Sequence, residues 1–441
     1  MKKIIYVLLV VVAFITSCKK DQDPIFDDPD TRLAKALDAD KSQITSATNG
    51  WKAMIYPKGG KGFSFYFLFG ADGKVKMLSD FNASTATTLQ ESTYRLKALQ
   101  RPTLIFDTYN YIHLAADPDA SVSGGASASG LSSDFEFAFA SVAGDSIKME
   151  GTFNSNKMVM IKLGAEESKA LLEGGLKTMT QANTAYLQLN KNPYLLFSDG
   201  TKGAVLIDPV AKTVKLNYLD SKEVSQLQTV NFAYGINKIT LSAYLKYGNF
   251  SFNELLYDPA GKIYYAMSGT TRIDLQNSVT PIIPLRTLFM PAGKDYSQME
   301  YNPNTVAANL SSDFNAKYSA AKTGLAAVGN AGRTLDAVRV IINLDNTMSL
   351  RFYYHNTSNS NFQANMTYSY SRDASGTFSF VYLASDGNAG VVGGGLTSLK
   401  DYFSNNTFKV DWVSNPGGGA SYGGFYTTAN PASFFYGTLI K

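Results

Sequence analysis

The chain has 441 residues, with 40 Lys and Arg against 36 Asp and Glu and a formal net charge of +4. This near-neutral charge, without a basic run, argues against nucleic-acid partners, which require a concentrated positive surface. A single cysteine excludes an intramolecular disulfide, so the folded part has to rest on core packing, for which a hydrophobic content of 45% is ample.

The first 17 residues have the pattern of a lipoprotein signal peptide. Lys2 and Lys3 precede an apolar stretch over residues 4–15, shorter than the roughly 20 residues that span a bilayer. The sequence Ile15-Thr16-Ser17-Cys18 resembles a bacterial lipobox. The resemblance implies cleavage before Cys18, lipidation of its sulfur and a stable anchor in the outer membrane. The alternative is an ordinary signal peptide followed by a free thiol.

Residues 18–30 are predicted to form a flexible acidic tether. The segment KKDQDPIFDDPD (19–30) has almost nothing to bury, so it should stay extended and solvated. Acidic residues directly after a lipidated cysteine resemble the export signal of Bacteroidetes-type lipoproteins. The resemblance implies the cell surface, with the periplasmic face as the alternative. A calcium site is disfavoured here because the aspartates lack the spacing and the glycine of a binding loop.

A helix is predicted to open the folded part of the chain. Leu33, Leu37, Ile44 and Ala47 fall on one helical face, and Asn49-Gly50 provides a stop signal. Trp51 follows, and we expect it to pack this helix onto a sheet.

Antiparallel hairpins are predicted to follow the helix. Four segments place Asp and Gly between aromatic-rich strands, namely residues 62–78, 195–207, 255–267 and 369–383. Such turns need an Asp that bonds to its own backbone and a glycine that adopts positive φ. Tyr and Phe, 27 of each, also suit pleated surfaces. The predicted fold is mainly β with a few short helices, in tandem antiparallel meander modules that form barrels, lipocalin-like, or sandwiches.

Three folded blocks are predicted. Residues 31–176 hold the first helix and a β-meander, and they end in a short helix over 165–176. Residues 177–300 form a second β-meander region. Residues 301–441 form a C-terminal domain, in which a helix over 304–328 precedes further strands.

Several segments together resemble a known family. They are NGWKAMIYP (49–57), GKVKMLSD (73–80), STYRL (92–96), PTLIFDTYNYIH (102–113) and SDFEFAF (133–139). Over roughly residues 31–290 the chain resembles Bacteroidetes-type surface lipoproteins with a domain of unknown function. Members occur beside Sus-type uptake systems, which pair a TonB-dependent porin with a binding lipoprotein. The resemblance implies a lipid-anchored accessory to nutrient capture with β-barrel modules. It carries over no catalytic residue.

Metal, nucleophile and phosphate chemistry have weak support in the sequence. His113 and His355 are the only histidines, and neither lies in a metal-binding motif. There is no G-x-S-x-G elbow. The glycine-rich stretches 391–398 and 415–424 lack the ending of a P-loop, so we interpret them as wide loops between strands. We therefore expect no metal and no cofactor.

Paired carboxylates are the one catalytic arrangement left open, because glycoside hydrolysis needs only two of them. Asp107 and Glu136 flank apolar strand residues and would have to face one cavity. Strand alternation instead places Phe135, Phe137 and Phe139 on one face and points Glu136 outward. A glycoside or peptide hydrolase is therefore the alternative function and not the leading one.

A binding face is the best-supported candidate site. In a strand over FDTYNYIH (106–113), four side chains share one face, namely Asp107, Tyr109, Tyr111 and His113. Tyrosines can stack on a sugar or a peptide while Asp and His orient it. The alternative is that the tyrosines cover neighbouring structure. The predicted function is a non-catalytic module for capture or uptake of a glycan or peptide, and a purely structural subunit of an uptake complex is a further alternative.

Overall fold

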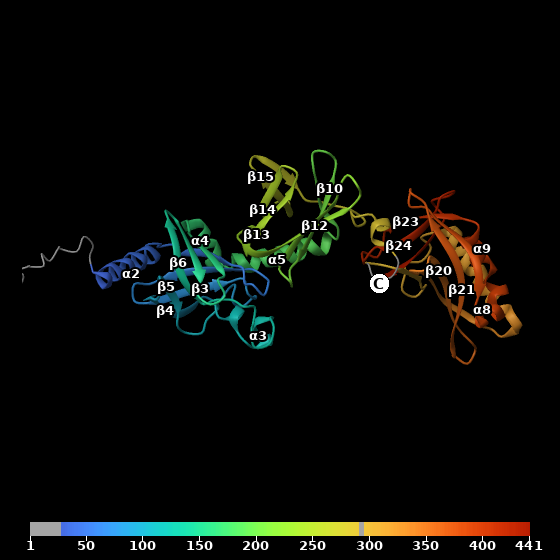
Figure 1. Cartoon of the computed structure of the whole chain (residues 1–441), viewed down its shortest axis with the longest axis horizontal. Helices are drawn as coiled ribbons and strands as arrows, with labels where there is room; N and C mark the ends of the chain where they lie inside the picture. Colours follow the sequence, from blue (N-terminus) through green and yellow to red (C-terminus); the bar gives the residue numbers. More distant parts are fainter. Residues whose placement is uncertain (1–27, 291–294) are drawn as a thin grey trace, which may run out of the picture. The chain divides into compact units, whose positions relative to one another are not determined.

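The computed structural model describes residues 28–290 and 295–441, so Cys18 and most of the predicted tether lie outside the described residues. Strands account for 44% of the residues and helices for 21%, which confirms the prediction of a mainly β fold with a few short helices. The strands form two closed eight-stranded barrels and a nine-stranded sheet (Figure 1). The described residues form two compact units: the part up to Lys177 includes the first barrel, and the part from Thr178 onward includes the nine-stranded sheet and the second barrel.

The N-terminal barrel is an antiparallel meander in which β1 pairs with both β2 and β8 and so closes the sheet. Alternate residues of β2, Phe65, Phe67 and Phe69, are buried in its core. Its strands are β1 (Trp51–Ile55), β2 (Phe63–Phe69), β3 (Lys74–Ser79), β4 (Gln90–Ala98), β5 (Pro102–Phe106), β6 (Glu136–Ala143), β7 (Ser146–Gly151) and β8 (Lys157–Lys162).

Helix α2 (Pro29–Thr45) precedes the first barrel. Asp28 caps it by accepting hydrogen bonds from the backbone N–H groups of Asp30 and Thr31. At its other end Ile44 is fully buried, and its carbonyl accepts a hydrogen bond of 2.7 Å from the Trp51 indole N–H. Trp51 thus ties the helix to the barrel.

The nine-stranded sheet runs in the order β16-β15-β14-β13-β12-β11-β10-β9-β17. All of its pairings are antiparallel. Its strands are β9 (Pro193–Leu196), β10 (Lys202–Asp208), β11 (Thr213–Leu219), β12 (Ser225–Gly235), β13 (Lys238–Tyr247), β14 (Phe250–Asp258), β15 (Ile263–Ser268), β16 (Thr271–Asp274) and β17 (Gln276–Asn277).

A helix that the sequence analysis missed packs on this sheet. The short helix expected over 165–176 is present as α4 (Ala165–Leu172), but a second helix, α5 (Gly175–Leu189), follows at once. Asn183 of α5 is fully buried: its amide donates to the Tyr234 hydroxyl, and its carbonyl oxygen accepts from the Tyr264 hydroxyl, both at 2.9 Å. This polar residue interrupts the apolar stripe by which a buried helix face is recognised.

The C-terminal barrel has the same strand order as the first, and β18 pairs with both β19 and β25. Its strands are β18 (Gln298–Tyr301), β19 (Thr334–Ile342), β20 (Thr347–His355), β21 (Asn361–Arg372), β22 (Phe378–Ser385), β23 (Thr407–Val413), β24 (Tyr422–Thr427) and β25 (Phe434–Ile440). The short helix α6 (Leu285–Leu288) precedes it and contributes Leu285 to its core.

Helix α7 (Ser312–Ala327) also packs into the C-terminal barrel. Its buried residues Phe314, Tyr318, Ala321 and Leu325 recur at helical spacing and join the barrel core. The one-turn helix η2 (Val328–Asn330) follows. The expectation of a wide glycine loop over 391–398 was wrong, because α8 (Gly387–Val392), η3 (Gly393–Leu396) and α9 (Thr397–Ser404) cover it.

Glycine is required there because η3 lies against α7. A Cβ built on Gly395 would lie 2.6 Å from the backbone of Gly324. The glycines thus allow close packing of two helices.

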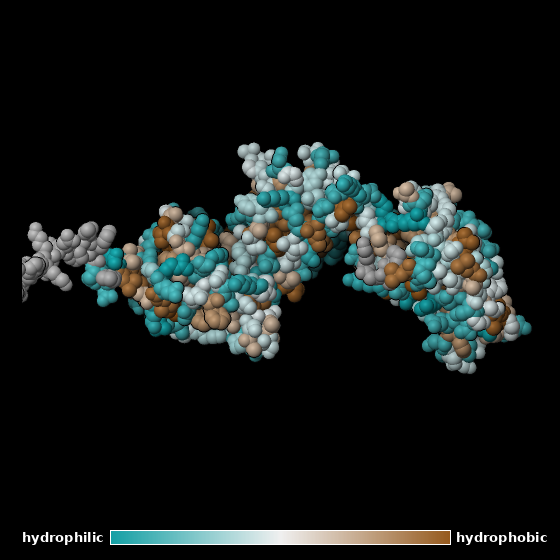
Figure 2. All heavy atoms as spheres, viewed as in Figure 1, coloured by the Kyte–Doolittle hydropathy of each residue, from teal (hydrophilic) through white to brown (hydrophobic). Residues whose placement is uncertain are grey.

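Apolar side chains are scattered among polar ones over the visible surface (Figure 2). Scattered surface hydrophobics are normal for a folded protein. Within the described ranges, no helix combines the length and the apolar character needed to cross a bilayer.

Candidate functional site

The long connection between β5 and β6 and the turn between β7 and β8 border a hollow in the N-terminal barrel unit. Its volume is about 790 Å³, within the usual range of small-molecule sites. The connection contains two single turns, η1 (Leu114–Ala116) and α3 (Ala120–Ser123). We call this cavity the Phe135 hollow. Its principal lining residues are Ser129, Ser132, Phe135, Glu136, Phe153 and Asn154.

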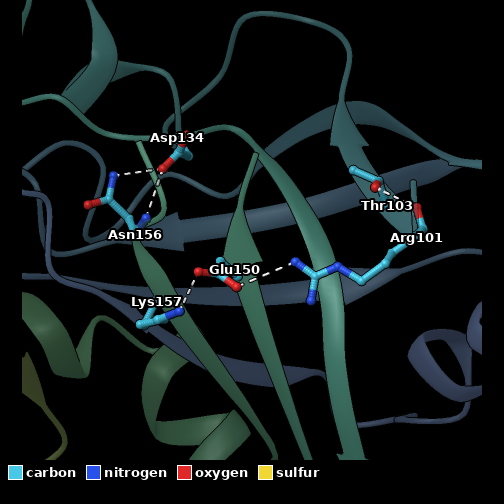
Figure 3. Close-up of polar contacts among 6 residues, drawn as sticks. All are labelled: Arg101, Thr103, Asp134, Glu150, Asn156 and Lys157. Atoms are coloured by element: carbon cyan, nitrogen blue, oxygen red, sulfur yellow. Dashed lines mark hydrogen bonds and ion pairs between the residues drawn. The ribbon is translucent and has the colours of Figure 1, made fainter. Parts of the chain in front are cut away.

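Asp134 fixes the turn that carries Phe153 and Asn154. Its carboxylate is buried and accepts hydrogen bonds from the backbone N–H groups of Phe153 (3.1 Å), Asn154 (2.7 Å) and Asn156 (3.1 Å). The Asn156 side-chain amide donates a fourth, at 2.8 Å (Figure 3). A Cβ on Gly151 would lie 2.0 Å from this carboxylate, so only glycine fits there. Four donors on one buried acceptor hold the turn in a single conformation.

The turn presents an unusually exposed aromatic ring to the hollow. Phe153 is 90% exposed, and Phe135, which also lines the hollow, is 38% exposed. Hydroxyl and amide groups of Ser129, Ser132 and Asn154 line the same space. Apolar ring surface beside hydrogen-bonding groups is the usual composition of a site for a small polar ligand.

An aromatic stack extends from the hollow along the β5–β6 connection. The Phe135 ring stacks on the His113 ring with centroids 4.6 Å apart, and His113 stacks on Tyr109 at 5.5 Å. The Tyr109 hydroxyl donates to the Asp117 carboxylate. Burial lowers the pKa of His113, although a hydrogen bond with the Phe106 backbone opposes the shift. His113 is therefore a neutral ring at neutral pH, well suited to stacking.

The predicted binding face on one strand was wrong, because β5 ends at Phe106 and residues 107–113 form bends and turns. Only two of its four residues come together, Tyr109 and His113. Asp107 instead forms an ion pair of 2.7 Å with Arg95. The Tyr111 hydroxyl donates to the Thr88 carbonyl at 2.9 Å, and its ring packs on the barrel core.

Asn110 causes the strand to end early. It is buried, and its side-chain amide donates to the Ser92 hydroxyl (2.9 Å) and to the Thr108 carbonyl (2.8 Å). Its carbonyl oxygen accepts from the Ile112 backbone N–H at 3.1 Å. These bonds fold the chain back on itself in place of a sheet ladder.

Sequence reasoning assigned no binding role to Phe135, Phe153 or Asp134. Phe135 and Phe153 come from separate loops, so no periodicity connects them. One signal was available: Phe153 sits in GTFNSNK (151–157), where a large aromatic occupies an otherwise polar turn.

The carboxylates considered for hydrolysis have separate partners. Glu136 lines the Phe135 hollow and accepts a long hydrogen bond of 3.4 Å from the Thr152 hydroxyl. Asp107 is engaged with Arg95. A second acid facing Glu136 across the hollow would be needed for general acid–base chemistry, and Asp107 does not supply it.

A charged cluster of Arg101, Glu150 and Lys157 lies on the same barrel (Figure 3). Glu150 on β7 accepts from the Lys157 ammonium at 2.5 Å and from the Arg101 guanidinium at 3.4 Å. The bonds from Lys157 and Arg101 lower the pKa of Glu150. The Thr103 hydroxyl donates to the Arg101 carbonyl at 2.9 Å. A smaller hollow of about 440 Å³ adjoins the cluster.

The two histidines lie in different settings. His113 belongs to the stack described above, whereas His355 Nδ1 lies 2.9 Å from the Asp336 carboxylate in the C-terminal barrel. Among the described residues, no group of three or more His, Cys, Asp or Glu side chains is placed to hold a metal ion.

No curated protein matches the chain. Among solved structures, it is similar to a DUF3598-family protein of unknown function from Nostoc punctiforme. That match has 8% identity and a TM-score of 0.15, and covers 74% of this chain and 97% of the other. It is also similar to the isotype 1 transferrin binding protein B of serogroup B Neisseria meningitidis, with 10% identity and a TM-score of 0.13, over 88% of this chain and 73% of the other. Likenesses this weak carry no argument.

A family defined by sequence gives a firmer result. The family described as "Domain of unknown function (DUF4302)" matches residues 22–259, which is more than half of the chain and includes the whole Phe135 hollow. The chain therefore belongs to the DUF4302 family.

Proposed function

We propose that the protein is a lipid-anchored accessory protein at the cell surface that captures a nutrient, a glycan or a peptide, without transforming it. The carrying observation is the pairing of exposed Phe135 and Phe153 rings with the hydroxyl and amide groups of the Phe135 hollow. Burial of such rings against a ligand provides affinity, and the polar groups orient the ligand.

The anchor and the uptake context rest on the sequence. In this proposal, Cys18 after the leader provides the membrane attachment, and the acidic segment that follows provides the surface address. The partner we propose is a TonB-dependent uptake complex, to which the captured nutrient passes.

A binding role is favoured over hydrolysis by the polar chemistry of the hollow. Two acids line it, Glu136 and Asp134, and the four hydrogen bonds that Asp134 accepts come from the turn between β7 and β8. The oxygens of Asp134 are thus already engaged within the protein and are not free to act on a ligand. Glu136 then serves to accept hydrogen bonds from a ligand.

A direct binding measurement tests this proposal. The chain from Lys19 onward, which lacks the lipid, is applied to glycan and peptide arrays, and hits are quantified by calorimetry. We expect Phe135→Ala and Phe153→Ala each to weaken binding by about tenfold, as for truncation of an interface aromatic. Tyr244→Ala, which removes a 55% exposed tyrosine from β13, is the matched control and should bind normally. Binding that survives both Phe substitutions would place the ligand elsewhere.

A further inference from the structure

The two barrels share one backbone hydrogen bond. In each, the residue that follows the seventh strand donates to the carbonyl of the first residue of the sixth strand. In the N-terminal barrel the Thr152 N–H donates to the Glu136 carbonyl at 3.0 Å. In the C-terminal barrel the Thr428 N–H donates to the Thr407 carbonyl at 2.9 Å. The corner beside the Phe135 hollow therefore has an exact topological counterpart in the C-terminal barrel.

The side chains at this corner differ in chemistry between the two barrels. The register pairs Ala138 with Glu150 in the first barrel and Lys409 with Tyr426 at the equivalent place in the second. Tyr426 also pairs with Phe434 on β25, and their ring centroids are 4.7 Å apart. An aromatic row thus replaces the ion cluster around Glu150. We call the surface formed by Lys409, Asp411, Tyr426 and Thr428 the Tyr426 face.

A hollow of about 420 Å³ lies over the Tyr426 face. The Tyr426 hydroxyl is already bonded within the protein, because it donates to the Trp412 carbonyl (2.9 Å). This bond fixes the orientation of the ring. What Tyr426 offers a ligand is therefore apolar surface held in place at little further entropic cost.

Two opposite charges lie beside the Tyr426 ring. Lys409 and Asp411 are two residues apart on β23, so they share its outer face, and both are exposed. Asp411 Oδ1 accepts from the Trp412 backbone N–H at 2.9 Å. Among the described residues, the Lys409 ammonium makes no ion pair. The charges of Lys409 and Asp411 sum to zero, which disfavours a charged ligand. The pair instead suits a ligand that both donates and accepts hydrogen bonds.

We propose that the Tyr426 face is a second binding site, and that it takes a neutral oligosaccharide. A sugar ring has an apolar face of C–H groups, which would lie on Tyr426, and an equatorial rim of hydroxyls. Those hydroxyls would donate to Asp411 and accept from Lys409. This site is separate from the Phe135 hollow and stands whether or not that hollow binds a ligand.

Calorimetry tests the proposal on the chain from Lys19 onward. The probes are neutral cello-, xylo-, manno- and malto-hexaose, with oligogalacturonate as the acidic arm and a neutral hexapeptide as the peptide arm. We expect at least one neutral hexaose to bind, and the titration to give its Kd.

Three variants assign the site. Tyr426→Ala should weaken the hexaose by about tenfold. Tyr426→Phe should bind like the wild type, because the hydroxyl it loses is bonded internally. Lys409→Ala changes an exposed residue and should also weaken binding, so it tests the site even if Tyr426→Ala does not fold. Tyr244→Ala should have no effect.

The proposal is overturned if none of the neutral hexaoses binds, or if only oligogalacturonate or the peptide binds. It is also overturned if binding is unchanged in Tyr426→Ala and in Lys409→Ala. Loss of binding in Phe135→Ala but not in these variants would assign the sugar to the Phe135 hollow instead.

Discussion

The His113 ring stacks on the Phe135 ring, with centroids 4.6 Å apart and an angle of 30° between their planes. The contact joins the β5–β6 connection to the start of β6. The contact also makes the packing of Phe135 depend on a titratable group. Protonation of the buried His113 ring carries a desolvation penalty that the neutral ring does not have, so it should weaken the stack. We therefore expect the conformation of the Phe135 hollow to change when His113 becomes protonated.

The pH dependence of stability tests this relationship. The pKa of His113 in the folded chain lies below the ordinary value of 6.5, so the unfolded chain binds the proton more readily. The free energy of unfolding should therefore fall as pH decreases from about 6.5 through the folded pKa. Urea unfolding at a series of pH values measures it.

Two substitutions assign that dependence. His113→Gln should flatten the curve between neutral pH and about pH 5, whereas His355→Gln should leave the loss in place. An unchanged curve in His113→Gln would refute a role for this ring.

Asp134→Asn should destabilise the N-terminal barrel by about 3 kcal/mol, because an amide NH₂ would face backbone N–H donors and leave several of them unsatisfied. Chemical denaturation gives the value. Glu136→Gln, two residues along the chain, is the control and should change stability by no more than about 0.5 kcal/mol. Similar small losses of stability in both variants would mean that the turn carrying Phe153 keeps its conformation without the Asp134 carboxylate.

Tyr109→Ala and Tyr111→Ala should differ, although the two residues are near neighbours. Tyr109 is 53% exposed, so its truncation should cost about 0.5–1 kcal/mol. Tyr111 packs on the barrel core and bonds to Thr88, so its loss should cost about 2–3 kcal/mol. Thermal melts of the two single variants compare them directly, and equal shifts would contradict the assigned environments.

Cys18→Ala should abolish incorporation of labelled fatty acid and release the protein from the membrane fraction, since the thiol is the site of lipid attachment in our proposal. Protease treatment of intact cells then separates the two possible addresses of the wild type: digestion indicates the outer surface, and protection indicates the periplasmic face. Undiminished labelling in Cys18→Ala would remove the lipoprotein assignment.

The fold class was predictable because turn chemistry is local. The Asp and Gly of residues 71–73 or 258–261 specify a reversal from a few neighbouring residues, and the strands on either side follow. Helix α5 was not predictable in the same way. Its buried Asn183 is satisfied by tyrosines 51 and 81 residues further along the chain, and no local window contains that information.

The candidate site was only half predictable for a related reason. Alternation of polar and apolar residues continues through FDTYNYIH, so the pattern predicts a strand up to His113. The chain leaves the sheet because the Asn110 amide finds Ser92 on another strand. The tyrosine and histidine were correctly singled out as unusual, but their geometry depends on that distant contact.

Each barrel begins and ends on paired strands, β1 with β8 and β18 with β25. Entry and exit points therefore lie side by side, so a whole barrel can be copied, inserted or removed as a cassette without opening a sheet. If the segment that encodes one barrel is duplicated within a gene, the two copies can diverge at one corner while the strand order is kept. A difference such as Glu150 in one barrel and Tyr426 at the same register position in the other is what such divergence would produce.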